Sequence, residues 1–157
     1  MFRLLKATLG LFLFFASSLH ADPLLQDMNG PLFKLKDLRG KWVFINYWAS
    51  WCKPCLHEIP ILNQFYEMNR HHNLALFAVN YEGLPNEAQL ELIHRFQIHY
   101  PSLAYDPADP LRLGEIRGVP VTFIFNPQGQ LRHTLFGEQT KETLQSFLTE
   151  RTLRNHG

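Results

Sequence analysis

The feature that most constrains this chain is the segment WCKPC, residues 51–55, which follows directly on a run of apolar and aromatic residues. That run, KWVFINYW at residues 41–48, is typical of a strand buried on both faces of a sheet. The residues after it repeat apolar side chains at helical spacing, which predicts a helix from residues 51–55 to about Arg70, kinked at Pro60. The expected buried stripe of this helix is formed by Leu56, Ile59, Leu62 and Phe65.

A second apolar run, NLALFAVN at residues 73–80, predicts that the chain returns to the same sheet. A strand, a helix and a strand in this order favour a right-handed parallel crossover, which indicates an α/β fold. Residues 86–97 are then expected to form another helix, with Asn86 and Gln89 as its capping box. A brief helical turn is expected at residues 111–115.

The end of the chain reads as a hairpin followed by a helix. Residues 121–125 and 130–136 are expected to pair as antiparallel strands, because the sequence NPQG between them is strong turn chemistry. Thr140 is expected to cap the last helix, and residues 32–35 could form a small edge strand. We therefore expect residues 22–157 to form one domain with a central mixed β-sheet flanked by helices.

The first 21 residues differ from the rest and have the layout of a secretory signal peptide. Basic residues come first, an apolar run follows at residues 9–16, and small or polar residues lead to Ala21. We expect cleavage near Ala21, with a site after Ser18 as the alternative. If the segment were not cleaved, it would remain as an N-terminal anchor. Export to an oxidising compartment would allow a disulfide between the two cysteines to persist.

The spacing of Cys52 and Cys55 suits a redox pair. A cysteine in the first turn of a helix meets free backbone N–H groups, and such placements lower a thiol pKa from about 8.5 into a range of roughly 3.5 to 7.5. Cys55 would lie one turn deeper on the same face, so Cys52 is expected to attack and Cys55 to resolve. Pro54 suits a first helical turn, and Lys53 adds a positive charge beside the thiolate unless it is simply a solvated lysine.

Charge and cysteine content argue against several other classes of function. The 15 basic and 14 acidic residues form no long run that would indicate nucleic acid or a polybasic membrane patch. A metal site would need further ligands, and none of the 8 histidines has a recognised ligand spacing beside the motif. A purely structural disulfide between residues 52 and 55 would close a loop too small to stabilise the fold much.

These residues together resemble the thioredoxin superfamily. The matching features are WASWCKPC after an apolar strand, a proline five residues past the second cysteine, and GVPVTF before a hairpin. Within the superfamily, the pattern WCxPCxxExP closely resembles the exported TlpA/ResA/CcmG group of thiol-disulfide oxidoreductases, over about residues 32–148. The resemblance implies a thioredoxin-like fold. The cytochrome c maturation branch usually has a different segment before the hairpin, and Arg117 and Val121 stand there in this chain, which counts against that pathway.

The resemblance implies roles for further residues. Pro120 falls where the superfamily has its cis-proline, opposite the active site, and Val119 before it would offer backbone groups to a substrate strand. Trp51 is expected to shield the disulfide and to shape the docking surface, with core packing as the alternative. The expected substrate-binding residues are Trp51, Lys53, Pro54, Val119 and Pro120.

Glu58 is the third expected catalytic residue. Cytosolic thioredoxins carry a buried acid six residues before the first cysteine, where this chain has Asn46. The exported group instead has a Glu three residues past the second cysteine, which is Glu58. The resemblance therefore implies that Glu58 modulates proton transfer at Cys55; the alternative is a surface glutamate that complements the start of the helix.

The sequence thus predicts a periplasmic thiol-disulfide oxidoreductase of a Gram-negative bacterium. Resemblance favours a reductant of protein disulfides that a membrane electron donor of the DsbD or CcdA kind re-reduces. No organic cofactor or metal is implied, because the cysteine pair itself holds two electrons. The alternatives are a disulfide oxidase or isomerase, and a Cu(I)-handling protein in which Cys52 and Cys55 would ligate the ion.

Overall fold

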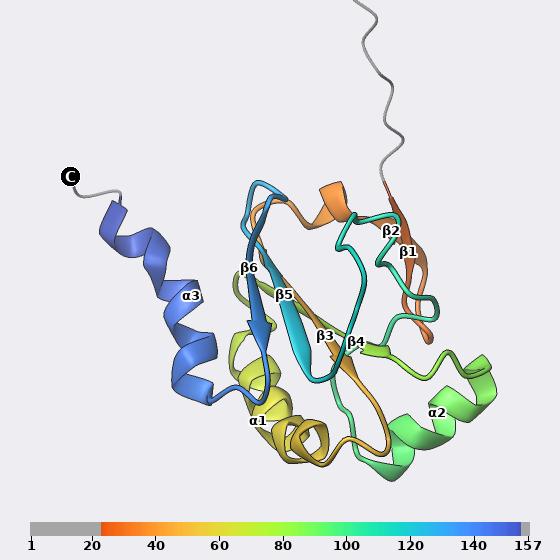
Figure 1. Cartoon of the computed structure of the whole chain (residues 1–157). Helices are drawn as coiled ribbons and strands as arrows, with labels where there is room; N and C mark the ends of the chain where they lie inside the picture. Colours follow the sequence, from red (N-terminus) through yellow and green to blue (C-terminus); the bar gives the residue numbers. More distant parts are fainter. Residues whose placement is uncertain (1–22, 155–157) are drawn as a thin grey trace, which may run out of the picture.

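The computed structural model describes residues 23–154 and, within them, the side chains of residues 23–149. Its centre is a four-stranded mixed sheet in the order β4-β3-β5-β6 (Figure 1). β3 is parallel to β4 and antiparallel to β5, and β5 is antiparallel to β6. The predicted α/β architecture and hairpin are therefore confirmed. The strands are β3 (Trp42–Trp48), β4 (Leu74–Asn80), β5 (Val121–Phe125) and β6 (Leu131–Phe136).

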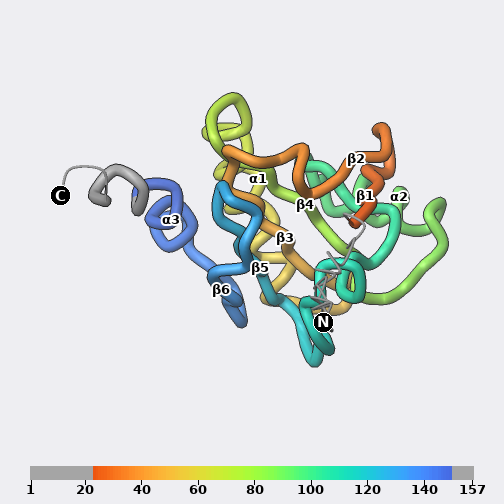
Figure 2. Tube along the Cα trace, turned by 90° about the horizontal axis from the view of Figure 1, so that it is seen from above, coloured from red at the N-terminus to blue at the C-terminus, as the bar shows by residue number. Residues whose placement is uncertain are grey.

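One face of the sheet is covered by α1 (Lys53–Asn69) and α3 (Lys141–Arg154). The buried stripe of α1 packs on Phe44 of β3, and Phe147 of α3 contacts the same ring at 6.3 Å between centroids. Leu56 differs from the prediction, because it is only partly buried. Figures 1 and 2 show α3 beside β6, on the opposite side of the molecule from the N-terminal strands.

The other face of the sheet is covered by the N-terminal segment and by the chain before β5. β1 (Leu24–Gln26) and β2 (Leu32–Lys34) form a separate antiparallel hairpin, followed by the 3₁₀ helix η1 (Leu35–Leu38). Phe33 of this hairpin stacks on Phe77 of β4, with 5.2 Å between ring centroids. β3 is thus buried on both faces, which explains why all of its residues except Asn46 are apolar or aromatic.

Helix α2 (Asn86–Arg95) begins differently from the prediction. Pro85 is the N-cap and provides no side-chain cap, so the expected capping box of Asn86 and Gln89 is wrong. Gln89 is buried, and its Nε2 donates to the carbonyl oxygen of Leu84 at 2.7 Å. Gln89 therefore turns back over the start of the helix and satisfies a carbonyl of the preceding loop instead.

Two short segments also differ from the prediction. Residues 111–115 form no helical turn; the turn lies at residues 108–112, where the N–H of Leu111 donates to the carbonyl of Pro107 at 3.0 Å. The strand expected at residues 32–35 exists as β2 but pairs with β1 rather than with the main sheet. β1 is absent from the prediction, because the segment around it is short and rich in polar and turn-forming residues.

The predicted signal segment at residues 1–21 lies outside the described residues. In the part of the chain that the structure describes, no helix is both long enough and apolar enough to cross a membrane.

Candidate active site

The two cysteines lie where β3 ends and α1 begins. Residues 49–52 form a turn in which the N–H of Cys52 donates to the carbonyl of Ala49 at 3.1 Å. Cys52 is the N-cap of α1, and its Sγ accepts a hydrogen bond from the N–H of Cys55 at 3.3 Å. The two residues form a disulfide with 5.2 Å between their Cα atoms. The first turn of the helix therefore holds both sulfurs on one face, and Sγ of Cys52 accepts a hydrogen bond from one of the backbone N–H groups at the positive end of the helix dipole.

Exposure differs sharply among the residues of the motif. Cys55 is 1% exposed and Cys52 5%, whereas Trp51 is 64% exposed. Lys53 and Pro54 are also exposed. The alternative that Trp51 is a core residue is therefore wrong. Trp51, Lys53 and Pro54 thus form the exposed part of the motif, and Cys52 is the more exposed of the two cysteines.

The loop before β5 faces the disulfide, as predicted. The peptide bond between Val119 and Pro120 is cis, and the carbonyl oxygen of Val119 lies 3.6 Å from Sγ of Cys52. In the disulfide this sulfur carries no proton, so the approach is a contact rather than a hydrogen bond. Pro120 is buried, and its carbonyl accepts from the N–H of Gly137 at 2.9 Å. This bond ties the loop to the end of β6.

Glu58 lies one helical turn beyond Cys55 and is 1% exposed, so the alternative of a surface glutamate is wrong. Its Oε2 accepts from Nδ2 of Asn46 at 3.1 Å, and its Oε1 accepts from the backbone N–H of Gln139 at 3.0 Å. Nδ2 of Asn46 also donates to Oγ1 of Thr122 at 3.0 Å. The carboxyl is therefore held by groups from β3 and from the β6–α3 loop.

Burial dominates the acidity of Glu58. Removal from water raises its pKa to about 7, although the hydrogen bonds from Gln139 and Asn46 favour the ionised form and act in the opposite direction. The nearby charge of Glu138 also raises the pKa. A carboxyl with this pKa exchanges a proton near neutral pH, and it lies on the helix face that carries Cys55.

Sequence reasoning missed the partners of Glu58. Asn46 carried a signal, since it is a polar residue inside the apolar run of β3 and a buried amide needs partners. Thr122 carried a weaker one in β5. Gln139 donates through its backbone N–H, and such a donor cannot be predicted from the residue type.

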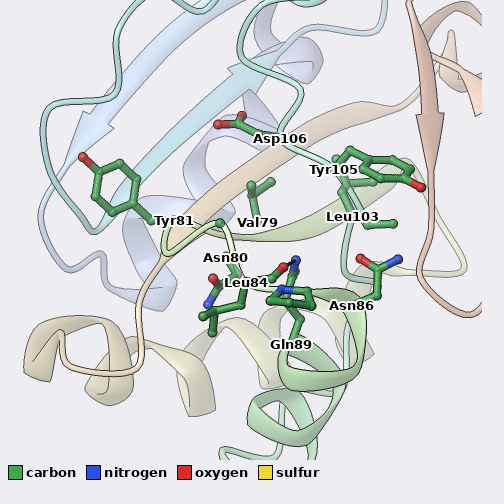
Figure 3. Close-up of a pocket in the computed structure, with 12 residues that line it drawn as sticks. Val79, Asn80, Tyr81, Leu84, Asn86, Gln89, Leu103, Tyr105 and Asp106 are labelled. Carbon is green, nitrogen blue, oxygen red and sulfur yellow. Dashed lines mark hydrogen bonds between the residues drawn. The ribbon is translucent and has the colours of Figure 1, made fainter.

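A pocket of about 520 Å³ lies at the carboxyl end of β4 (Figure 3). Asn80, Tyr81, Tyr105 and Asp106 are among its lining residues. The side chain of Asp106 is held in place, because it accepts a hydrogen bond from the hydroxyl of the buried Tyr47 at 2.6 Å. The pocket is separate from the disulfide, which is not among its lining residues.

The side chains of residues 23–149 contain no group of three or more His, Cys, Asp or Glu residues arranged to hold a metal ion. The cysteine pair, the cis-proline loop and Glu58 instead form a site that can take up and release two electrons together with protons. Such a site can exchange a disulfide with a dithiol.

Comparison with known proteins agrees with this chemistry. Residues 20–134 match the AhpC/TSA family. The thiol-disulfide oxidoreductase ResA of Geobacillus kaustophilus is 32% identical over 127 residues, which cover 81% of this chain and 72% of that protein.

Solved structures show the same fold. A Chlorobium tepidum protein assigned as the thiol:disulfide interchange protein DsbE has a TM-score of 0.66 and 27% identity, and the match covers 81% of this chain and 90% of that one. StoA of Bacillus subtilis has a TM-score of 0.67 and 24% identity, with 82% and 96% covered.

Proposed function

Since the chain belongs to the AhpC/TSA family and is a thioredoxin-like thiol-disulfide oxidoreductase, we propose that it reduces disulfides of other proteins through Cys52 and Cys55. One observation carries the assignment of roles. Cys52 is the N-cap of α1, lies beside the Val119 carbonyl and is 5% exposed, whereas Cys55 is 1% exposed. After reduction, the helix start favours a thiolate at Cys52.

The proposed exchange has two steps. The Cys52 thiolate attacks one sulfur of the substrate disulfide, so that a mixed disulfide forms and the first substrate thiolate leaves and takes up a proton. Cys55 then loses its proton and attacks Sγ of Cys52, which releases the second substrate thiol. The substrate disulfide gains two electrons, and the cysteine pair loses them as it becomes the disulfide.

Glu58 is proposed to receive the proton of Cys55 in the second step. Its pKa of about 7 allows it to accept that proton and to lose it again near neutral pH. The two hydrogen bonds from Asn46 and Gln139 stabilise its charged form. Glu58 is thus proposed to accept the proton of the resolving cysteine, Cys55. The start of the helix is proposed to stabilise the thiolate of the attacking cysteine, Cys52.

The substrate is proposed to dock over Trp51, Lys53 and Pro54 and along the backbone of Val119, which precedes Pro120. All three side chains of the motif are exposed around the sulfurs. An indole offers a large apolar surface at small entropic cost. An extended segment of a protein is therefore the expected substrate.

We propose that this activity takes place in the periplasm. The support is the secretory layout of residues 1–21, ahead of the thioredoxin-like domain proposed for residues 22–157. Each turnover leaves the pair oxidised, so the cycle requires a donor of two electrons. A membrane protein of the DsbD or CcdA kind is the proposed donor.

The reduction potential of the Cys52/Cys55 pair, measured against glutathione and dithiothreitol buffers, tests the direction of electron flow. A reductant is expected at about −270 mV or below, the range of thioredoxin. A value near about −120 mV would instead make the protein an oxidant and would overturn the proposal.

A further inference from the structure

The carboxylate of Glu82, in the loop after β4, is hydrogen-bonded to the turn that precedes the cysteine pair. Its Oε2 accepts from the backbone N–H of Ser50 at 2.8 Å, and its Oε1 accepts from the hydroxyl of Ser50 at 2.9 Å. Both oxygens are therefore used on one residue. Ser50 lies two positions before Cys52, inside the turn that the N–H of Cys52 closes on Ala49.

The carboxylate of Glu82 is itself held in place by hydrogen bonds with Asn80. Nδ2 of Asn80 donates to Oε2 of Glu82 at 3.1 Å, and the N–H of Glu82 donates to Oδ1 of Asn80 at 2.9 Å. Asn80 is buried at the end of β4, so the sheet holds this arrangement in place. The parallel register, which pairs Trp48 with Asn80, brings the two strand ends side by side.

The acidity of Glu82 agrees with this arrangement. Burial acts to raise its pKa, but the hydrogen bonds from Ser50 and Asn80 outweigh burial and hold the pKa below its usual value. The group is therefore a carboxylate at neutral pH, and its bonds to Ser50 are charge-assisted.

We propose that Glu82 is a positioning residue for the thiol-disulfide exchange, which acts by fixing Ser50 and thereby presenting Trp51 and Cys52 to the substrate. Trp51 is 64% exposed, so its direction depends largely on the backbone of the turn. A turn that ends at the attacking sulfur transmits any displacement to it. Small misplacements of reacting groups are sufficient to slow a reaction markedly.

The inference rests on the proposed role of Cys52 as the attacking thiol. It differs from a purely structural role of Glu82, which would change stability without changing the mobility of Trp51 or the exchange rate of the folded protein. Fluorescence separates the two, because Trp42 and Trp48 are buried and Trp51 is exposed. The signal of Trp51 is obtained by subtracting that of the Trp51→Phe variant.

The test compares Glu82→Gln with Glu91→Gln, a change of an exposed carboxyl in α2. Glutamine is neutral and its NH2 group cannot accept from the Ser50 hydroxyl, so the two charge-assisted bonds to Ser50 are weakened or lost. In the full-length protein we expect Glu82→Gln to lower kcat/KM for a protein disulfide by about three- to tenfold and to increase the fast depolarisation of Trp51. Glu91→Gln is expected to change neither.

Two further variants test whether the effect passes through Ser50. Ser50→Ala keeps the backbone donor and should lower the rate less than Glu82→Gln. In the Ser50→Ala background the loss caused by Glu82→Gln should be smaller than in the wild type, because contacting residues are coupled. Asn80→Ala keeps the carboxylate but removes its support, and it replaces Glu82→Gln if that variant does not fold.

Unchanged Trp51 mobility and rate in a folded Glu82→Gln variant would overturn the inference, as would independent effects of Ser50→Ala and Glu82→Gln. A different result would show that the proposed function is wrong. A Cys52→Ala variant that still exchanged disulfides would remove the attacking role of Cys52, whereas the mobility of Trp51 would still report whether Glu82 holds the turn.

Discussion

Glu58 is almost completely removed from water, and two donors, the Asn46 amide and the Gln139 backbone, satisfy one lone pair on each of its oxygens. This environment still favours the neutral acid, because burial outweighs both hydrogen bonds in setting the pKa. A buried carboxyl kept near its titration point responds to small changes of charge. The proposed formation and loss of a thiolate at Cys55, one turn away, would be such a change.

The raised pKa makes the stability of the oxidised protein depend on pH. Between the ordinary value of 4.5 and about 7 the folded protein binds the proton of Glu58 more tightly than the unfolded chain does. The contribution of Glu58 to the free energy of unfolding should therefore fall as pH rises through this window, by up to about 3 kcal/mol. Urea unfolding of wild type and Glu58→Gln across this window measures it as the difference between the two curves. Parallel curves would contradict the raised pKa.

Replacement of the resolving cysteine should trap the exchange halfway. In Cys55→Ala the mixed disulfide on Cys52 has no internal thiol to release it, so it should accumulate with a protein substrate. Non-reducing electrophoresis followed by mass spectrometry detects the adduct. Cys52→Ala is the matched control and should form none, because Cys55 is the less exposed of the two cysteines, at 1% against 5%. Equal trapping by both variants would argue against the assigned order.

At the scale of elements, β3 and α1 place the site. Asn46 of β3 is buried in the interior, and β3 ends at the turn before Cys52. The buried face of α1 contains Cys55 and Glu58. Phe44 and Phe65 pack between the two elements, with 5.4 Å between ring centroids. The chemistry of the site therefore depends on how firmly this helix is seated on the strand.

Substitutions of two leucines in α1 test how this helix packs on β3. Leu62 is completely buried, so Leu62→Ala should lower the free energy of unfolding by about 3 kcal/mol through lost burial and a residual cavity. Leu56 is only partly buried, so Leu56→Ala should cost clearly less. Chemical denaturation of the oxidised proteins compares the pair. Equal losses would mean that the buried face of α1 is assigned wrongly.

Elements with a strong local pattern could be predicted from the sequence, and those without one could not. The apolar run of β3 and the helical spacing of α1 are local properties, as is the placement of Cys52 at a helix start. The contact of Glu58 with Asn46 depends on how a helix lies on a strand, and the donor at Gln139 comes from 81 residues further along the chain. Such contacts depend on tertiary structure, which a local pattern does not contain.

At the scale of the whole molecule, segments far apart in the sequence meet at one end of the sheet. The cysteine turn, the cis-proline loop and the end of β6 are joined there, the last two through the bond between Gly137 and Pro120. Two large apolar side chains are exposed on these segments, Trp51 at 64% and Phe136 at 78%. Exposed aromatic side chains near a reactive group are typical of a surface that binds proteins.

A protein substrate should depend on this surface more than a small one does. We expect Trp51→Ser to lower the exchange rate with a protein disulfide by about tenfold or more, and that with oxidised glutathione by much less. Met68→Ser is the control, since Met68 is equally an exposed apolar residue of the molecule but lies near the far end of α1. Stopped-flow fluorescence gives both rates. A similar loss for both substrates would assign Trp51 to the chemistry rather than to docking.

The bond from the Gln139 backbone to Glu58 bears on where the protein can be shortened. The family match ends at residue 134, inside β6, yet this donor and the whole of α3 lie beyond it. A chain cut at that boundary would keep Cys52, Cys55 and Glu58 but would lose one partner of the carboxyl and the apolar cover of α3. The region that the family match covers is thus smaller than the unit that sets the acidity of Glu58.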